Sequence, residues 1–576
     1  MRVTKSGLLG LLLASASMLA AQSQPVAPAA PATAAAPTTM EQVVDRIISR
    51  EQAVMQSMHQ YKPLVETYIQ NLRPDPGLGA VPAGDKYFLG RADLESGVEV
   101  RSLSEGKSGR MHSVMGRMGG MFSLSMEYLP AGFLQMIYLD NEGFNRQNYN
   151  FEYVRREFLG EVRCLVFDVT PQPKSGKGRF LGRIWVEDQN HTIVRFNGAY
   201  SGNSKSNFYF HFDSWRVNTG PNLWLPAYVY SEESNMPYAL WKRLQFKAQT
   251  RLWGYNLGPA GRESELSKVL VEAATPVNDQ TETSKDLSPL QAQRAWDRQA
   301  EDNVVERMER IGLLAPRGDV DKVLDTVVNN LEVTNNLDIQ PEVRCRVLLT
   351  STLESFTIGH TIVLSRGLID VLPDEATLAT MIAHELGHVV LGHRIDTQYA
   401  FNDRLLFKDE ETFQHFVFSR NEAEEAAASQ KALELLKNSP YKEMGNTARF
   451  IQALNARAKQ VPNLISPHLG DRVPTSAEFL TAAETSPAPA SDAKDTKDAK
   501  LALVIAALPL GSRVKVDPWS NRTEMLKAKT GGLVSEREKM PFEVTPFMLY
   551  LTRQSNLQQP PAVTAESKPD PNKKPD

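Results

Sequence analysis

The chain has 576 residues, 41% of them apolar, and its 64 lysines and arginines against 68 aspartates and glutamates give a formal net charge of -4. This length exceeds what one hydrophobic core normally organises, so at least two globular domains are expected. The charge is nearly balanced and shows no dominant basic patch, and we therefore exclude nucleic acid as a partner.

The N-terminus is typical of an export signal. Arg2 and Lys5 precede the apolar stretch GLLGLLLASASMLA, and Ala20 and Ala21 offer a cleavage point. We expect a signal peptide over residues 1–21 and a mature protein in the periplasm or, alternatively, secreted. The apolar run is shorter than the roughly 20 residues of a spanning helix, and no later segment is long and apolar enough either. No transmembrane helix is therefore expected in the mature chain.

A Pro/Ala-rich linker over 22–39 leads into the first predicted domain, residues 40–257. From Met40, apolar residues recur at helical spacing up to about Leu72, which predicts one long amphipathic helix. Polar and apolar residues then alternate in short runs between turn formers from about 85 to 255. This pattern predicts an antiparallel sheet built from hairpins.

The rest of the chain completes an α+β multidomain organisation. A linker is expected over 258–290, and helical patterns with a strand pair, VRCRVLLTS and HTIVLSRGLI, predict a mainly α-helical domain with a small sheet over 291–485. A disordered linker over 486–500, a segment with a few strands over 501–556 and a disordered tail over 557–576 follow.

The chain has two cysteines, Cys164 and Cys345. They could pair in an oxidising compartment. We predict instead that they are buried thiols in strands of different domains.

The stretch MIAHELGHVVLGH, residues 381–393, carries the pattern of a metal site. On a helix, His384 and His388 project from one face a turn apart, which lets two ring nitrogens reach one ion at about 2.0–2.1 Å. Glu385 then stands beside the first ligand as a general base for water, as in H-E-x-x-H metalloproteases. An acidic helix start, an apolar face and Gly387, which allows close approach of a neighbour, favour this interpretation over three incidental histidines.

A third ligand has to come from elsewhere in the chain. A metzincin would carry Gly and His where this chain has Leu391 and Arg394, so that class is excluded. His393 lies nine residues after His384, out of phase on a continuing helix, and we interpret it as a helix-end residue or a support for the ligands. A carboxylate from the later helix SRNEAEEAAASQKALELLKNSPY is the natural candidate.

The motif helix, the preceding strand and the later EEAAASQKALELLKNSPY together resemble the CAAX-prenyl-protease and HtpX-type zinc peptidases, peptidase family M48. The resemblance covers about Val320 to Arg472 and implies a gluzincin peptidase that binds one Zn²⁺ per chain. In that family a strand like HTIVLSRG pairs with extended substrate. We assign this role to His360, Thr361, Ile362, Val363 and Leu364.

The resemblance also implies a glutamate ligand, followed four residues later by an aspartate. Alignment on Leu435, Leu436 and Tyr441 places the ligand at Glu425 and puts Ser429 in the aspartate's position. A second register would place Ala423 and Ala427 there. We prefer the first register because it leaves a carboxylate to bind the metal.

Glu422 and Glu424 are the alternative ligands on the same helix. In relatives the aspartate orients a ligand histidine, so Ser429 departs from the family pattern in the support of the metal ligands.

A second departure lies in ISPHLGDR. Relatives carry His-Pro with an arginine five residues after the proline, and the histidine assists the transition state. Pro467 and Arg472 fit this pattern, whereas Ser466 replaces the histidine. His468 either takes over its role from two residues away or is an ordinary loop residue.

A long helix followed by a meandering sheet resembles the open half-barrel of LolA-like and RseB-like lipoprotein-binding domains, most closely in GRIWVEDQNHTIVRFNG. This resemblance implies a lipoprotein or acyl chain as a partner, and a scaffold for the next domain is an equal alternative.

These patterns predict an exported zinc endopeptidase that cleaves extended or unfolded polypeptide in envelope protein quality control. The alternative is a zinc-retaining but weakly active or inactive homologue that acts as a holdase or lipoprotein-binding factor. A structural partner of an envelope assembly is the third possibility.

Overall fold

The computed structural model describes residues 39–76, 79–94, 99–103, 130–140, 143–201, 210–239, 242–256, 289–402, 407, 409–473, 510, 513–525, 542–546 and 548–553. The predicted signal peptide, the linker over 486–500 and the tail lie outside these residues. So do the linker over 22–39, except Thr39, and the linker over 258–290, except its last two residues. The described residues from Val44 onward belong to one compact unit, and the contacts given below lie within it.

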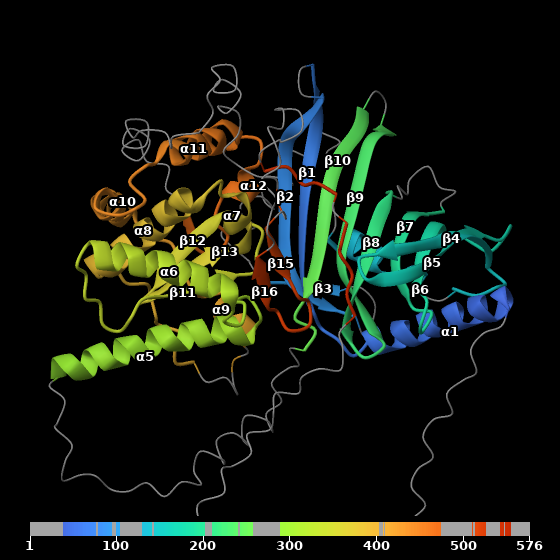
Figure 1. Cartoon of the computed structure of the whole chain (residues 1–576), viewed down its shortest axis with the longest axis horizontal. Coiled ribbons are helices and arrows are strands. Elements are labelled where there is room, and N and C mark those ends of the chain that lie inside the picture. Colours follow the sequence, from blue (N-terminus) through green and yellow to red (C-terminus); the bar gives the residue numbers. More distant parts are fainter. Residues whose placement is uncertain are drawn as a thin grey trace, which may run out of the picture. The chain divides into compact units, whose positions relative to one another are not determined.

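An open antiparallel sheet of ten strands forms the N-terminal part of the fold, as expected (Figure 1). Its strands follow the order β3-β2-β1-β10-β9-β8-β7-β6-β5-β4. Their bounds are β1 Leu64–Asp75, β2 Gly79–Asp93, β3 Glu99–Ser102, β4 Tyr149–Leu159, β5 Val162–Pro171, β6 Phe180–Glu187, β7 Ile193–Tyr200, β8 Phe212–Gly220, β9 Leu223–Ala239 and β10 Lys242–Trp253. The sheet does not close, because β3 and β4 remain its two edges.

The helical elements described beside this sheet are α1 Met40–Met58, α3 Pro130–Leu134 and the 3-10 turn η1 Gln135–Ile137. Glu51 of α1 and Arg216 of β8 form a buried ion pair, with two hydrogen bonds of 2.6 and 2.7 Å between the guanidinium and the carboxylate. This pair joins α1 to the middle of the sheet.

The prediction of one helix from Met40 to about Leu72 is wrong in its second half. The helix ends at Met58, and Leu64 begins strand β1 after Pro63. Proline cannot continue a helix and pushes the preceding residue toward extended backbone. Because β1 lies between β2 and β10, its first seven residues are all buried, and the strand lacks the polar and apolar alternation that would have identified it.

The second part of the fold consists of helices around a small sheet (Figure 1). The helices are α5 Pro289–Arg310, α6 Asp319–Thr334, α7 Arg366–Val371, α8 Glu375–Leu391, α9 Asp409–Phe413, α10 Glu422–Lys437, α11 Gly445–Arg457 and α12 Pro462–Ile465. The strands are β11 Arg344–Leu348, β12 Glu354–Ile358, β13 Thr361–Ser365 and β14 Asp471–Arg472, in the order β11-β13-β12-β14. The expected strand pair is β11 and β13, which run parallel, and β12 was not predicted.

Two further strands, β15 Val514–Val516 and β16 Thr523–Met525, form a hairpin in the small C-terminal segment, as expected. Cys164 of β5 and Cys345 of β11 are free and buried, which confirms the predicted thiols. Among the helices that the structure describes, none has the length and apolar character to cross a membrane.

A buried polar cluster joins the large sheet to the helical part. Glu66 of β1 accepts hydrogen bonds from Tyr87 and Arg251 of the same sheet, at 2.8 and 2.9 Å. The same carboxylate accepts from the backbone N–H and the hydroxyl of Ser351, at 2.5 and 2.7 Å. Because Ser351 lies between β11 and β12, this cluster fixes the small sheet against the large one.

Candidate metal centre

Helix α8 carries the H-E-x-x-H motif and has a well-defined start and end. The carboxylate of Asp374 caps its N-terminus by accepting from the backbone N–H of Thr377 at 2.8 Å. Gly392 ends the helix with a φ of 71°, a left-handed conformation that glycine adopts readily. The helix is buried continuously from Thr377 to His388, so the motif side chains are held inside the fold.

Helix α10 brings the third candidate ligand to α8. Asn421 caps this helix by accepting from the backbone N–H of Glu424, whose own side chain reaches back to the backbone of Asn421. Glu424 is therefore used in the cap, and Glu422 is exposed on the first turn. Glu425 is the carboxylate that lies next to the motif histidines.

The packing of α10 against α8 depends on one small residue. A Cβ atom built on Gly387 would lie 2.7 Å from the carbonyl oxygen of Ala428. The close approach expected of Gly387 is thus confirmed, and its neighbour is the backbone of α10. Since Ala428 lies one turn after Glu425, this contact sets the distance between Glu425 and the histidines.

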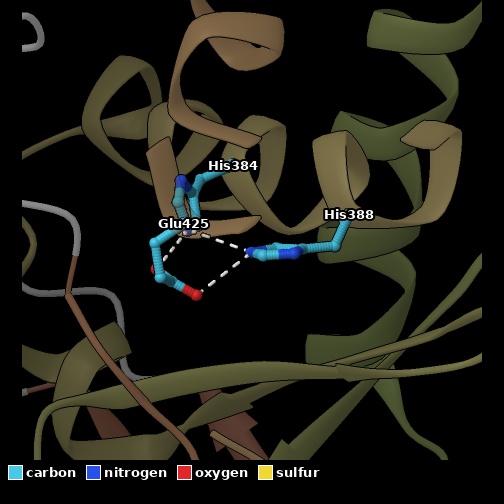
Figure 2. A group of neighbouring side chains, drawn as sticks. All are labelled: His384, His388 and Glu425. Atoms are coloured by element: carbon cyan, nitrogen blue, oxygen red, sulfur yellow. Dashed lines mark hydrogen bonds and ion pairs between the residues drawn. The ribbon is translucent and has the colours of Figure 1, made fainter. Parts of the chain in front are cut away.

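The side chains of His384, His388 and Glu425 converge on one point (Figure 2). Nε2 of His384 lies 3.2 Å from Oε2 of Glu425 and 3.4 Å from Nε2 of His388. Nε2 of His388 lies 3.4 Å from Oε1, the other oxygen of that carboxylate. With one atom taken from each residue, the three ligand atoms all lie within 4.8 Å of one another. A tetrahedral zinc ion with ligand bonds of about 2.0–2.1 Å separates its ligand atoms by about 3.3–3.4 Å, so the three residues fit zinc.

The outer nitrogens of both imidazoles have partners of their own. Nδ1 of His384 lies 3.3 Å from the hydroxyl of Ser429, and Nδ1 of His388 lies 2.9 Å from Nδ1 of His393. When both Nδ1 atoms carry the proton, both Nε2 atoms present lone pairs to each other and to a carboxylate. Three such acceptors this close repel one another unless a cation lies between them.

Glu425 is ionised at this site. Partial burial raises the pKa of its carboxyl group, but hydrogen bonds and charge from the two imidazoles, when these are protonated on Nε2, outweigh burial and lower the pKa to about 2. An anionic oxygen beside two imidazole nitrogens is the donor set that zinc binds in catalytic sites with two histidines and a glutamate.

The carboxylate of Glu385 contacts the small sheet. It accepts a hydrogen bond of 2.6 Å from the hydroxyl of Ser355 and one of 2.7 Å from the hydroxyl of Thr357, both on β12. The prediction missed these two residues because it missed β12. The alternating polar residues of ESFTI, between the two predicted strands, were the signal that could have revealed them.

The structure places the other predicted residues as follows. His393 follows the end of α8, and its Nδ1 atom contacts that of His388. Burial and the neighbouring His388 lower the pKa of His393. The hydroxyl of Ser429 lies beside Nδ1 of His384.

Residues of ISPHLGDR surround the start of β12. The Nε2 atom of His468 lies 2.9 Å from the carbonyl oxygen of Asn463, and its ring packs 4.5 Å from that of Tyr87 in the large sheet. The backbone N–H of His468 donates to Glu354. Ser466 follows α12, and the backbone of Arg472 pairs with that of Glu354. These contacts pack the ring of His468 against the large sheet.

The assignment of the substrate strand to residues 360–364 is wrong. Strand β13 pairs with β11 on one side and with β12 on the other, so neither of its edges is open to another chain. His360 precedes the strand, and its carbonyl accepts from the backbone N–H of Arg344. The error has a simple cause, because the sequence does not show which strand of a small sheet lies in the middle.

A helix with H-E-x-x-H and a glutamate from a second helix together define a centre of the metallopeptidase class. Residues 319–441 match the model of Peptidase family M48, which confirms the resemblance inferred from the motif helix and supports a metallopeptidase. The curated proteins include no match to this chain.

Among solved structures, a LolA superfamily protein from Nitrosomonas europaea is similar to this chain at 12% sequence identity and a TM-score of 0.18. The similarity covers 38% of this chain and 93% of that protein.

Proposed function

We propose that this protein is an exported zinc-dependent endopeptidase that cleaves extended or unfolded polypeptide. The observation that carries the proposal is the convergence of His384, His388 and Glu425, whose imidazole nitrogens and carboxylate oxygens make contacts of 3.2–3.4 Å. The match of residues 319–441 to a peptidase family supports the same reaction class.

In this proposal His384, His388 and Glu425 hold the ion. When bound, zinc supplies a Lewis acid that polarises the scissile carbonyl and makes water more acidic. Glu385 takes the proton from the attacking water while the water oxygen bonds to the carbonyl carbon. Glu385 then returns the proton to the amine nitrogen as the C–N bond breaks, so that the residue ends the cycle ionised.

Strand β12 is the part of the small sheet best placed to meet the substrate. It lies directly beside Glu385, since two of its side chains contact that carboxylate. On its outer side, β14 pairs with Glu354 and Ser355, and no strand pairs beyond Ser355 among the described residues, where the carbonyl of Thr357 accepts from the side chain of Arg420. An extended substrate that adds to the remaining edge would be recognised mainly through its backbone, which suits unfolded polypeptide.

The cellular setting is part of the proposal and has support only from the sequence. The basic and apolar N-terminal residues suggest export to the periplasm, where damaged envelope proteins would supply unfolded substrate. A lipoprotein or acyl chain bound at the large sheet is a further part of this proposal. Lipid analysis of the purified protein checks it, and a protein free of co-purifying lipid or acylated peptide would count against it.

Replacement of the general base tests the proposed reaction. Glu385→Gln keeps the size of the side chain but cannot take a proton, and general-base catalysis contributes about 10²–10⁴-fold in rate. We expect the zinc-loaded variant to keep its metal and to lose chelator-sensitive cleavage of an unfolded test protein. The exposed Glu422→Gln is the matched control on α10. Undiminished cleavage by Glu385→Gln would refute the assignment.

A second candidate function is a zinc-retaining but weakly active homologue that serves as a holdase. The observation that favours it is Ser429, because a hydroxyl at 3.3 Å orients His384 less firmly than the carboxylate of relatives. A purified protein with one zinc per chain, no chelator-sensitive cleavage and the ability to prevent aggregation of an unfolded protein would support this function over the first.

A further inference from the structure

The carboxylate of Glu385 is held at both oxygens by one strand. Ser355 donates its hydroxyl proton to Oε1 and Thr357 donates to Oε2, at 2.6 and 2.7 Å. All three side chains are buried, with at most 1% of each residue exposed. Hydrogen bonds of this length from a hydroxyl to a carboxylate oxygen are among the strong ones.

The two hydroxyls face Glu385 because of the geometry of β12. Side chains two positions apart on a strand point to the same side of the sheet. Phe356, between them, points the other way and stacks on Phe418 with ring centroids 4.8 Å apart. Arg420 donates to the carbonyl oxygen of Thr357 at 2.9 Å, and β13 pairs with the strand along its length. The hydroxyls therefore have little freedom to move away.

This arrangement leaves Glu385 able to act as a base. Each carboxylate oxygen can accept about two hydrogen bonds, so one position on each oxygen remains for water. The side chain of a glutamate has three rotatable bonds, and a misplacement of about 1 Å can cost about 10²-fold in rate. Two donors from one fixed strand remove most of that freedom.

We propose that Ser355 and Thr357 are positioning residues that hold the Glu385 carboxylate in the orientation needed to take a proton from the attacking water. The proposal rests on the proposed peptidase function and adds two residues to it. It also explains why a buried carboxylate next to a metal ligand turns toward the small sheet.

Single substitutions in the zinc-loaded full chain distinguish the effect of each hydroxyl group from the effect of side-chain packing. Thr357→Val keeps the shape of the side chain and removes the hydroxyl, whereas Thr357→Ser keeps the hydroxyl and removes a methyl group. We expect Thr357→Val and Ser355→Ala each to lower kcat on unfolded casein about tenfold with KM and zinc content unchanged. Thr357→Ser should restore most of kcat.

The control is Thr380→Val, which removes a buried hydroxyl from the helix that carries Glu385. The Thr380 hydroxyl donates to the carbonyl of Ala376 and lies 3.4 Å from the hydroxyl of Thr447. Neither contact involves Glu385, so loss of this hydroxyl should not lower kcat. Equal losses in Thr357→Val and Thr357→Ser would show that packing matters and the hydroxyl does not, and would overturn the proposal. Wild-type kcat in Thr357→Val would also overturn it.

A thermal-unfolding cycle tests the contact without relying on activity. Thr357→Val should lower the melting temperature by several degrees in the wild-type background and by less than half as much in a Glu385→Ala background. Equal shifts of the melting temperature in both backgrounds would show that Thr357 does not stabilise the Glu385 carboxylate. A wild-type chain without chelator-sensitive cleavage would instead refute the peptidase function, and the cycle would still report on the contact.

Discussion

Gly387 of α8 lies so close to Ala428 of α10 that a Cβ atom on the glycine would stand 2.7 Å from the alanine carbonyl oxygen and 3.2 Å from its Cα. Backbone cannot yield as a flexible side chain can, so any larger residue must push the two helices apart. These helices carry the two histidines and the glutamate of the candidate metal centre. Their separation therefore controls the size of the site.

Gly387→Ala should damage stability and metal binding together. We expect a loss of about 1–3 kcal/mol in the free energy of unfolding, the usual cost of overpacking, and weaker zinc binding. Denaturant unfolding and zinc titration measure the two effects. The matched control is Gly84→Ala on β2, where an added Cβ meets nothing within 4 Å. Unchanged zinc affinity in Gly387→Ala would show that the separation of α8 and α10 does not control the geometry of the metal site.

Ser429→Ala tests the support of His384. The hydroxyl of Ser429 lies 3.3 Å from Nδ1 of His384, and loss of such an outer partner typically costs about 10–100-fold in metal affinity. Because the hydrogen bond is long, we expect the lower end of that range, with the fold intact. Zinc titration against a competing chelator checks it. The neighbouring exposed residue provides the control Gln430→Ala, and equal affinities in both variants would rule out a role for Ser429.

Glu66→Ala should weaken the connection between the large sheet and the helical part. The substitution leaves the buried Arg251 without its carboxylate and removes the partner of Ser351. Removal of one member of a buried ion pair costs about 3–5 kcal/mol of stability. Denaturant unfolding of the full chain measures it. Lys322→Ala, which breaks an exposed ion pair with Asp319, is the control, and a similarly small effect in both would contradict a stabilising role for the cluster.

Local patterns accounted for much of the fold. The motif helix was predictable because the residues that determine its cap, its burial and its histidine spacing all lie within 374–392. The strands from β5 to β10 alternate visibly between polar and apolar residues, so the antiparallel sheet was predictable as well. The proximity of Glu425 to the histidines followed from a resemblance to known peptidases, since no local pattern joins α8 to α10.

Features set by tertiary arrangement were not predictable in the same way. Strand β1 is buried on both faces, and its apolar residues at Leu64, Val65, Tyr68 and Ile69 fit helical spacing as well as a central strand. The central position of β13 depends on the order of strands, which the spacing of residues along the chain does not contain. The contact of Ser355 and Thr357 with Glu385 depends on that same order.

Zinc content of the purified full chain decides whether His384, His388 and Glu425 form a metal site. Elemental analysis after dialysis should find one zinc per wild-type chain, one in the exposed control Glu422→Gln, and far less in Glu425→Gln, which loses an anionic ligand 3.2 Å from His384. A wild-type chain without zinc, or a Glu425→Gln variant that binds zinc as tightly as the wild type, would contradict the proposed site.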